Sequence, residues 1–165
     1  MDCLNVVVII TCPTNLYFLN DVNFIYMDGT FEYCPKHFTQ LYTIHGYKNG
    51  IYTPLVFGLL PDKNSETYII FLELLKKNML NLGLQFQPQN IVLDFERAMH
   101  AAVNSCWKNV NIFGCKFHLH QNWFRKIQSL NLQQEYKNTN SIIGKYLKYY
   151  FGLCFLKPTD VTSFF

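Results

Sequence analysis

Charged residues are scarce in this sequence, and several patterns that identify a class of protein are missing from it. Only 15% of the 165 residues are charged and 50% are hydrophobic, which is typical of a folded domain and not of a disordered chain. No internal repeat, low-complexity segment or linker occurs. The apolar run Val6 to Ile10 is far shorter than the roughly 20 residues that cross a bilayer. We therefore expect one globular domain and no membrane partner.

Two further absences bear on the compartment. The apolar run near the N-terminus has no basic segment before it, since Asp2 is the only charge there, so we expect no signal peptide. The cysteines have wide, irregular spacings without a Cys-x-x-Cys pair, which favours reduced thiols in an intracellular protein, most of them small core residues. The six cysteines are Cys3, Cys12, Cys34, Cys106, Cys115 and Cys154.

The few charges are unevenly placed. Residues 1–107 hold six Lys/Arg and nine Asp/Glu, whereas residues 108–165 hold eight Lys/Arg and two Asp/Glu. The basic C-terminal part permits an anionic partner, of which nucleic acid is the obvious one. A solvated basic face is the alternative, because the basic residues are dispersed and not clustered.

The pattern of apolar residues predicts three strands, two of them joined by the hairpin turn at Asn49-Gly50, followed by βαβ units. Pro54 predicts an irregularity in the third strand. Ser65 is expected to cap the first helix and Gly83 to end it. The fold class is therefore α/β, a mixed sheet flanked by helices. The expected strands cover residues 22–34, 38–47, 51–61, 89–95 and 110–118. The expected helices cover 66–82, 97–107, 119–130 and 141–156, with a new element opening at Pro158.

Two of these strands end in acids, Asp28 and Asp94, and in this order of elements the two strands can be neighbours. Two carboxylates forced together repel each other, and a divalent cation usually relieves the repulsion. Such a pair plus a third acid can hold two metal ions for phosphoryl transfer. Gly29 is expected to let the backbone turn away after the first acid. The alternative is that each acid only caps the turn after its strand.

Four stretches together resemble the MULE transposase domain, the Mutator-like members of the DDE transposases. They are YMDGTFEYCPKHFTQLYTIHGY, PLVFGLLPDKNSETYIIFLELL, IVLDFERAMHAAV and CKFHLHQNWFRKI. The resemblance implies an RNase H-like domain over residues 16–165, with residues 1–15 as an N-terminal extension. It implies Mg²⁺- or Mn²⁺-dependent DNA strand cleavage and transfer at transposon ends, hence a nuclear protein, and it makes Asp28 and Asp94 the first two catalytic, metal-binding acids.

The family's Cys-x-x-His motif matches Cys115 and His118, which are expected on the strand and turn after the second acid. The resemblance makes them candidates for the active-site neighbourhood. Zinc is an alternative, although a closed zinc site needs four ligands. A plain core cysteine beside a surface histidine is the third reading. The candidates for the remaining zinc ligands are His120, Cys106 and His100.

The sequence departs from the family pattern at the third acid, a Glu that follows a helical insertion. After the Cys-x-x-His motif only Glu135 and Asp160 occur, and neither matches that position. We therefore expect a transposase-derived core that is truncated within or before the insertion and lacks its last acid. Two alternatives stay open: a domesticated nucleic-acid-binding or protein-interaction module without catalysis, and a different two-metal nuclease that uses Glu96. Self-association is a further expectation, beside DNA as partner. Glu96 could share a face with Asp94 only where the chain is locally extended.

Overall fold

The structure is a computed structural model that describes residues 6–30 and 32–164 of the chain. Cys3 and Phe31, the last residue of the Asp-Gly-Thr-Phe motif, lie outside these described residues. The chain divides into two compact units, Met1–Gly114 and Cys115–Phe165.

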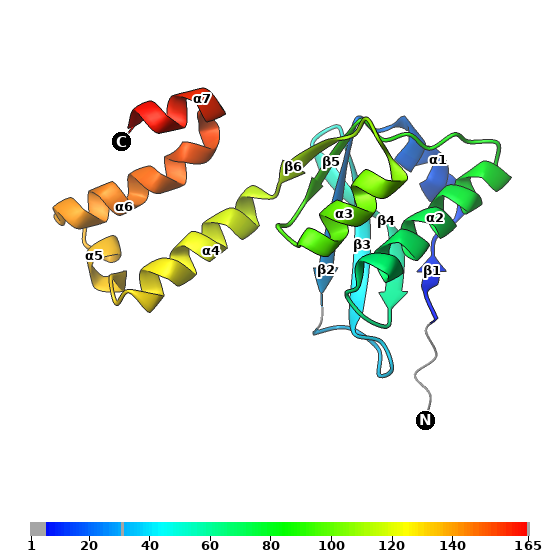
Figure 1. Ribbon diagram of the computed structural model, residues 1–165, viewed down its shortest axis with the longest axis horizontal. Coiled ribbons are helices and arrows are strands. Elements are labelled where there is room, and N and C mark those ends of the chain that lie inside the picture. The colour runs from blue at the N-terminus through cyan, green and yellow to red at the C-terminus, as the bar shows by residue number, and fades with distance from the viewer. Residues whose placement is uncertain (1–5, 31, 165) are drawn as a thin grey trace. The chain divides into compact units, whose positions relative to one another are not determined.

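A six-stranded sheet forms the centre of the first unit (Figure 1). The strand order is β1-β4-β3-β2-β5-β6, in which β1, β4, β3 and β2 run antiparallel to their neighbours and β2, β5 and β6 run parallel. This mixed sheet confirms the predicted α/β class. The strands are β1 Val8–Ile10, β2 Phe24–Thr30, β3 Gln40–Lys48, β4 Ile51–Leu60, β5 Asn90–Leu93 and β6 Asn111–Gly114.

The helices follow the predicted order, with one addition near the N-terminus and a short helix, at residues 133–137, where a loop was expected. The first unit contains α1 Pro13–Asp21, α2 Ser65–Asn81 and α3 Arg97–Cys106. The second unit contains α4 Lys116–Ser129, α5 Gln133–Lys137, α6 Ile142–Gly152 and α7 Pro158–Val161, with short 3₁₀ turns at Leu153–Phe155 and Thr162–Phe164. Strand β1 and helix α1 were not anticipated, and β1 pairs with β4 through Val8 and Leu59.

The hairpin between β3 and β4 forms as the sequence predicts. Asn49 and Gly50 have φ angles of 54° and 82°, the left-handed values that Asn and Gly adopt most easily. The irregularity predicted near Pro54 is also present. The pairing register shifts between Ile44 and His45, and His45 pairs with Pro54 across that shift.

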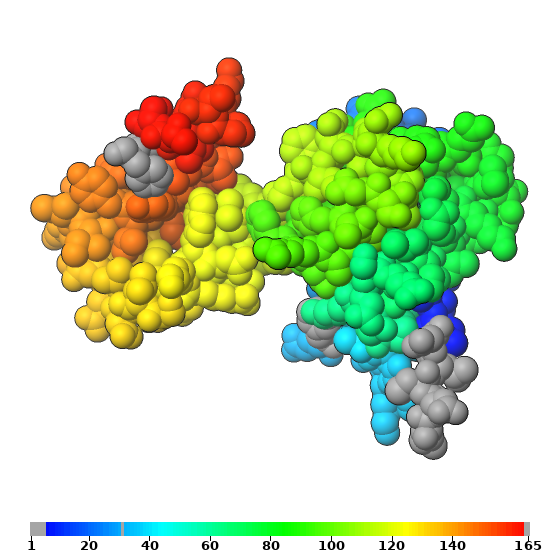
Figure 2. All heavy atoms as spheres, in the orientation of Figure 1, coloured from blue at the N-terminus to red at the C-terminus, as the bar shows by residue number. Residues whose placement is uncertain are grey.

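Strict alternation along β3 buries one face of the sheet. Tyr42 and Ile44 point into the core, and helix α2 covers this face at close range. A Cβ atom at Gly58 would lie only 2.5 Å from the ring of Phe71 on α2, so the helix packs directly on a strand that carries no side chain there. Figure 1 shows α2 and α3 side by side over the sheet, and their side chains cover it in Figure 2.

Helix α2 begins one residue earlier than predicted, because Asn64 and not Ser65 is its N-cap. The Ser65 hydroxyl instead donates to the carbonyl of Ala98 on α3 at 3.2 Å, which ties the two helices together. The predicted packed face is correct at Leu72, Leu75 and Met79, which are fully buried, whereas Ile69 and Leu82 are only partly so. Tyr68 and Phe71 are also fully buried.

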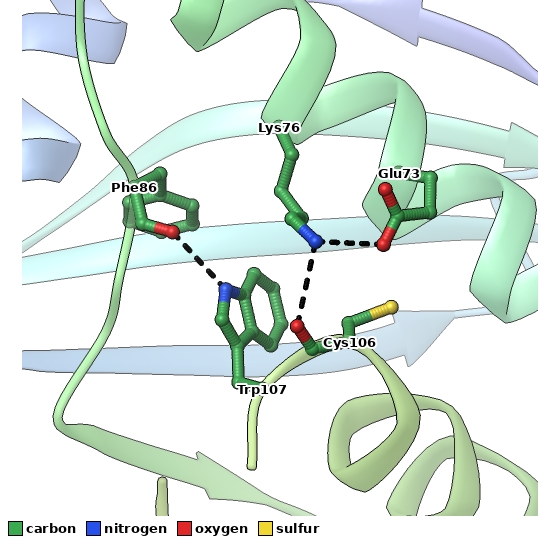
Figure 3. A network of polar contacts seen from close by, with 5 residues as sticks. All are labelled: Glu73, Lys76, Phe86, Cys106 and Trp107. Carbon is green, nitrogen blue, oxygen red and sulfur yellow. Dashed lines mark hydrogen bonds and ion pairs between the residues drawn. The ribbon is translucent and has the colours of Figure 1, made fainter. Parts of the chain in front are cut away.

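A second tie between these helices lies near the end of α3 (Figure 3). The ammonium of Lys76 donates to Glu73 at 2.7 Å and to the carbonyl of Cys106 at 3.4 Å. The indole of Trp107 donates to the carbonyl of Phe86 at 3.1 Å.

Burial, followed by the neighbouring Glu73 carboxylate, raises the pKa of the Cys106 thiol to about 11. Cys106 is therefore a neutral thiol that packs against the core. The prediction that most cysteines are core residues is wrong, because among the described cysteines Cys12 is exposed and the others are only partly buried.

The opposite face of the sheet carries partly exposed aromatic rings. Tyr26 packs edge-on against Tyr52 at 4.8 Å between ring centroids, and Tyr47 lies 4.6 Å from Tyr52. Phe24 and Phe113 make a second pair at 5.7 Å. These rings shield one another without forming a closed core.

The second unit is a group of helices with little interior of its own. Among its described residues Ile127 is the only large apolar side chain that is fully buried. A groove of about 270 Å³ lies between α4 and α6 and is lined by Trp123, Ile127, Leu147 and Phe151 among others. No helix in the described part of the chain is long and apolar enough to span a bilayer.

Candidate metal-binding active site

The two predicted acids lie on neighbouring strands at equivalent heights. Tyr26 of β2 pairs with Val92 of β5 in a parallel register. Asp28 and Asp94 each follow two residues beyond that pair. Neighbouring strands are about 5 Å apart, so the register brings the two acids to the same end of adjacent strands. The predicted adjacency of these strands is confirmed.

Asp28 does not end its strand, as the sequence suggested, but lies inside it. Pairing with β3 continues through Gly29 and Thr30, which extends β2 beyond the acid. Because Ile25 and Met27 face the core, Asp28 leaves the sheet on the opposite face, and it is exposed. Its carboxylate accepts a hydrogen bond from the amide of Gly29 at 2.8 Å.

Gly29 has a role other than the predicted one of turning the chain. The strand passes straight through it, and its φ angle is not in the left-handed region. A Cβ atom here would lie 2.8 Å from Oε1 of Gln40 and 3.1 Å from the ring of Tyr42. The absent side chain therefore makes room for two buried β3 side chains directly beside Asp28.

Asp94 follows β5 immediately, as predicted, and shapes the turn into α3. Its carboxylate accepts a hydrogen bond from the amide of Glu96 at 3.0 Å, and its carbonyl lies 2.7 Å from Nε2 of His100. The turn-capping role that was the alternative for Asp94 is thus present. One carboxylate oxygen engaged in this way still leaves the other for a ligand.

A buried polar layer lies under the acids, on the face of the sheet that the helices cover. Gln40, which is fully buried, donates from Nε2 to the hydroxyl of Tyr68 at 2.8 Å. Tyr68 in turn donates to Oε1 of Glu96 at 3.0 Å. Glu96 is the N-cap of α3 and has an extended backbone, with φ −74° and ψ 112°, which is the local condition under which it could approach Asp94.

The hydroxyl of Tyr42 belongs to this layer and interacts electrostatically with all three acids. Burial raises the pKa of its hydroxyl well above the usual value, and the charges of Asp94, Glu96 and Asp28 add to the effect. Burial also lowers the pKa of His45, and Asp28 opposes that shift. Gln40, Tyr42 and Tyr68 were not among the site residues predicted from the sequence. The alternation of β3 places Gln40 and Tyr42 on one face, but only the fold brings them under the acids.

Cys115 and His118 belong to the second unit, and their predicted closeness to the acids stays a prediction. The structure corrects their local setting. Strand β6 ends at Gly114, Cys115 is the N-cap of α4, and His118 lies in the first turn of that helix. The helix begins earlier than predicted because its hydrogen bonds start at the carbonyl of Cys115, which accepts from the amide of Leu119 at 3.1 Å.

The other zinc candidates have contacts elsewhere. Nε2 of His120 lies 3.5 Å from Sγ of Cys154, His100 contacts Asp94, and Cys106 lies beside Glu73. Within residues 6–30 and 32–164 no three His, Cys, Asp or Glu side chains gather as a group that could hold a metal ion. Glu135 bonds the hydroxyl of Ser141 at the N-cap of α6.

One comparison with known protein families finds a match. The MULE transposase domain matches residues 24–122, which is more than half of the 165-residue chain and includes both acids and the Cys-x-x-His motif. A comparison with curated proteins finds no match. The extent of the family match shows that this chain belongs to the MULE transposase domain family.

Proposed function

We propose that the chain is a transposase-derived core that holds a divalent cation at Asp28 and Asp94 for DNA strand cleavage and transfer at transposon ends. Membership of the family implies interaction with DNA in general. The observation that carries the proposal is the register of β2 and β5, which places the two acids at the same end of adjacent parallel strands. The sheet has four antiparallel strands, β1, β4, β3 and β2, followed by β5 and β6, which run parallel to β2, and this order supports an RNase H-like fold for the core.

The donor chemistry of the site suits Mg²⁺ or Mn²⁺. Both cations prefer oxygen ligands, and Asp28 supplies an exposed carboxylate beside Asp94. When bound, the cation would stabilise negative charge on a phosphoryl group. The protein's own part is to hold the carboxylates in place. Gly29, Thr43 and Glu96 do so through a donated hydrogen bond each, the first to the Asp28 carboxylate, the second to the Asp28 carbonyl and the third to the Asp94 carboxylate.

The second candidate is a domesticated module that binds nucleic acid or protein without cleaving DNA. It is favoured by the lack of a third metal-ligating side chain beside the acid pair within the described residues. A site with two acids leaves catalytic metals under-coordinated and costs orders of magnitude in rate. Self-association and a nuclear location belong to both candidates as proposals.

Nicking of a supercoiled plasmid distinguishes the two candidates. The chain is incubated with plasmid in Mg²⁺ and then in Mn²⁺, beside the double variant Asp28→Ala, Asp94→Ala. Because no third metal-ligating side chain gathers with the acid pair among the described residues, we expect no nicking by this chain under either condition. Nicking that the double variant lacks would instead support the catalytic reading and contradict the expectation of an incomplete site.

A further inference from the structure

All three helices of the first unit pack on one face of its sheet. A Cβ atom at Gly46 would lie 3.1 Å from the ring of Phe18 on α1, and a Cβ atom at Gly58 would lie 2.5 Å from the ring of Phe71 on α2. Helix α3 lies beside α2 over the same face (Figure 1). Among the described residues of this unit, no helix covers the opposite face, from which Asp28 projects. Within the first unit, that face is therefore accessible to a ligand.

Aromatic rings continue this face away from Asp28. Phe24 and Tyr26 precede Asp28 at two-residue intervals on β2, so the three side chains leave the same face at steps of about 7 Å. Phe113 lies 5.7 Å from Phe24, and Tyr52 lies 4.8 Å from Tyr26, between ring centroids. Tyr26 is partly buried, and the other three rings are exposed. We call these four rings the aromatic strip, and it leads along β2 to the acid.

The exposure of the aromatic strip is unusual for its place in the sheet. Phe24 and Phe113 lie on β2 and β6, which run parallel with β5 between them. Parallel strands are almost always covered on both faces. Contiguous apolar patches that remain exposed on a folded protein mark binding surfaces. The aromatic strip therefore suits a ligand that covers these rings.

The position of the aromatic strip favours the bases of a nucleic acid as that ligand. Family membership implies interaction with DNA, and a phosphate held at the acid pair would bring the next nucleotides of its strand within reach of β2. Aromatic rings on open sheet faces stack with bases, each of which offers a flat π face. Bases inside a duplex already stack on one another, so only unpaired bases can lie on these rings. A protein bound here would instead cover Asp28.

We propose that the aromatic strip stacks with unpaired bases of the DNA strand whose phosphate lies at Asp28 and Asp94, so that the ligand of this face is single-stranded DNA. This inference rests on the proposed function, because it takes the acid pair as the place of the phosphate. Stacking itself requires no cation. The platform and the cation site can therefore be tested separately.

Fluorescence anisotropy of the full chain with labelled oligothymidylate tests the proposal, in EDTA so that no cation contributes. The wild type should bind this single strand more tightly than a duplex of the same length. Tyr52→Leu keeps an apolar side chain but removes the ring, so single-strand affinity should fall about tenfold, and Phe113→Leu should act in the same direction. The slope of log affinity against log salt should not change, because no phosphate contact is lost. Tyr52→Phe keeps the ring and should bind as the wild type does.

Tyr17→Leu is the matched control. Tyr17 lies on α1 and is 52% exposed, against 56% for Tyr52, but it belongs to a helix on the other face of the sheet. This variant should bind the single strand as the wild type does. Circular dichroism of each variant establishes that the affinities are measured on folded protein.

The outcomes separate the platform from the cation site. Wild-type single-strand affinity in Tyr52→Leu and Phe113→Leu, no preference of the wild type for the single strand, or an equal loss in Tyr17→Leu would each overturn the platform. A dimeric wild type beside a monomeric Tyr52→Leu variant, measured by light scattering, would assign the face to a second copy of the chain instead. Weakened binding in Tyr52→Leu, together with unchanged Mn²⁺ affinity in Asp28→Asn and Asp94→Asn, would support the platform and overturn the cation site.

Discussion

Some residues at this site have more than one structural or chemical role, or a role other than the predicted one, and Gly29 is the clearest case. A glycine after an acid at a strand end suggests a turn, but here the strand continues and the missing Cβ admits Gln40 and Tyr42. Asp94 likewise caps the turn into α3 and lies at the height of Asp28. A structural role for a residue does not exclude a chemical one, since a carboxylate has two oxygens.

The close packing at Gly29 leads to a prediction for Gly29→Ala. The new methyl group would overlap Gln40 and Tyr42, which are both buried, so we expect the free energy of unfolding to fall by about 1–3 kcal/mol. Urea denaturation followed by circular dichroism measures the change. Gly50→Asn is the control, because nothing lies within 4 Å of Gly50 and Asn tolerates a positive φ. Equal stability of Gly29→Ala and the wild type would show that the β3 side chains have room to move.

At the scale of elements, the position at which α4 begins changes how the Cys-x-x-His motif is understood. The sequence placed Cys115 and His118 on a strand and the following turn. Strand β6 in fact ends at Gly114, and Cys115 is an N-cap whose side chain makes no capping hydrogen bond. Cysteine is a poor N-cap compared with serine, which accepts a hydrogen bond from the first turn. The choice of cysteine here is therefore not explained by helix capping.

Cys115→Ser tests whether this thiol has only a structural place. If it does, serine should cap α4 and stabilise the second unit by about 0.5–1 kcal/mol. Thermal unfolding followed by circular dichroism, with and without a chelator, measures the effect. Cys34→Ser, a half-buried thiol outside any helix, is the control. A destabilised Cys115→Ser protein, beside a wild type that a chelator weakens, would instead favour the zinc alternative.

At the scale of the whole molecule, the two units differ in their charge balance and in how many apolar residues they bury. Met1–Gly114 holds seven Lys/Arg and nine Asp/Glu, whereas Cys115–Phe165 holds seven and two. The core of the first unit draws on all three of its helices, while the second unit has one fully buried large apolar residue among those described. An excess of positive charge on a unit with little interior suits a surface that binds an anionic partner.

We expect the whole chain to bind duplex DNA weakly, without sequence preference and with strong salt dependence. Arg125→Glu with Lys145→Glu should weaken binding and reduce the slope of log affinity against log salt by about one to two, because contacts to phosphate release counterions. Fluorescence anisotropy at several salt concentrations measures this slope. Lys36→Glu with Lys77→Glu makes the same charge change on exposed residues of the first unit. An equal effect of this control pair would contradict a DNA surface on the second unit.

The sequence by itself determined the elements and the chemistry that they offer. Period-two alternation, the Asn49-Gly50 turn and helical spacing in α2 are local signals, so the order of strands and helices from β2 onward was predictable, apart from the short helix α5. Asp28 and Asp94 could be selected as candidate site residues because the same local signals placed each acid at the end of a predicted strand. Only the tertiary structure decided the parallel register of β2 and β5, the packing of Gln40 and Tyr42 over Gly29, and the bond from Tyr68 to Glu96. These contacts join residues that are more than ten positions apart, and their geometry depends on how the strands pair and the helices pack on the sheet and not on any local pattern.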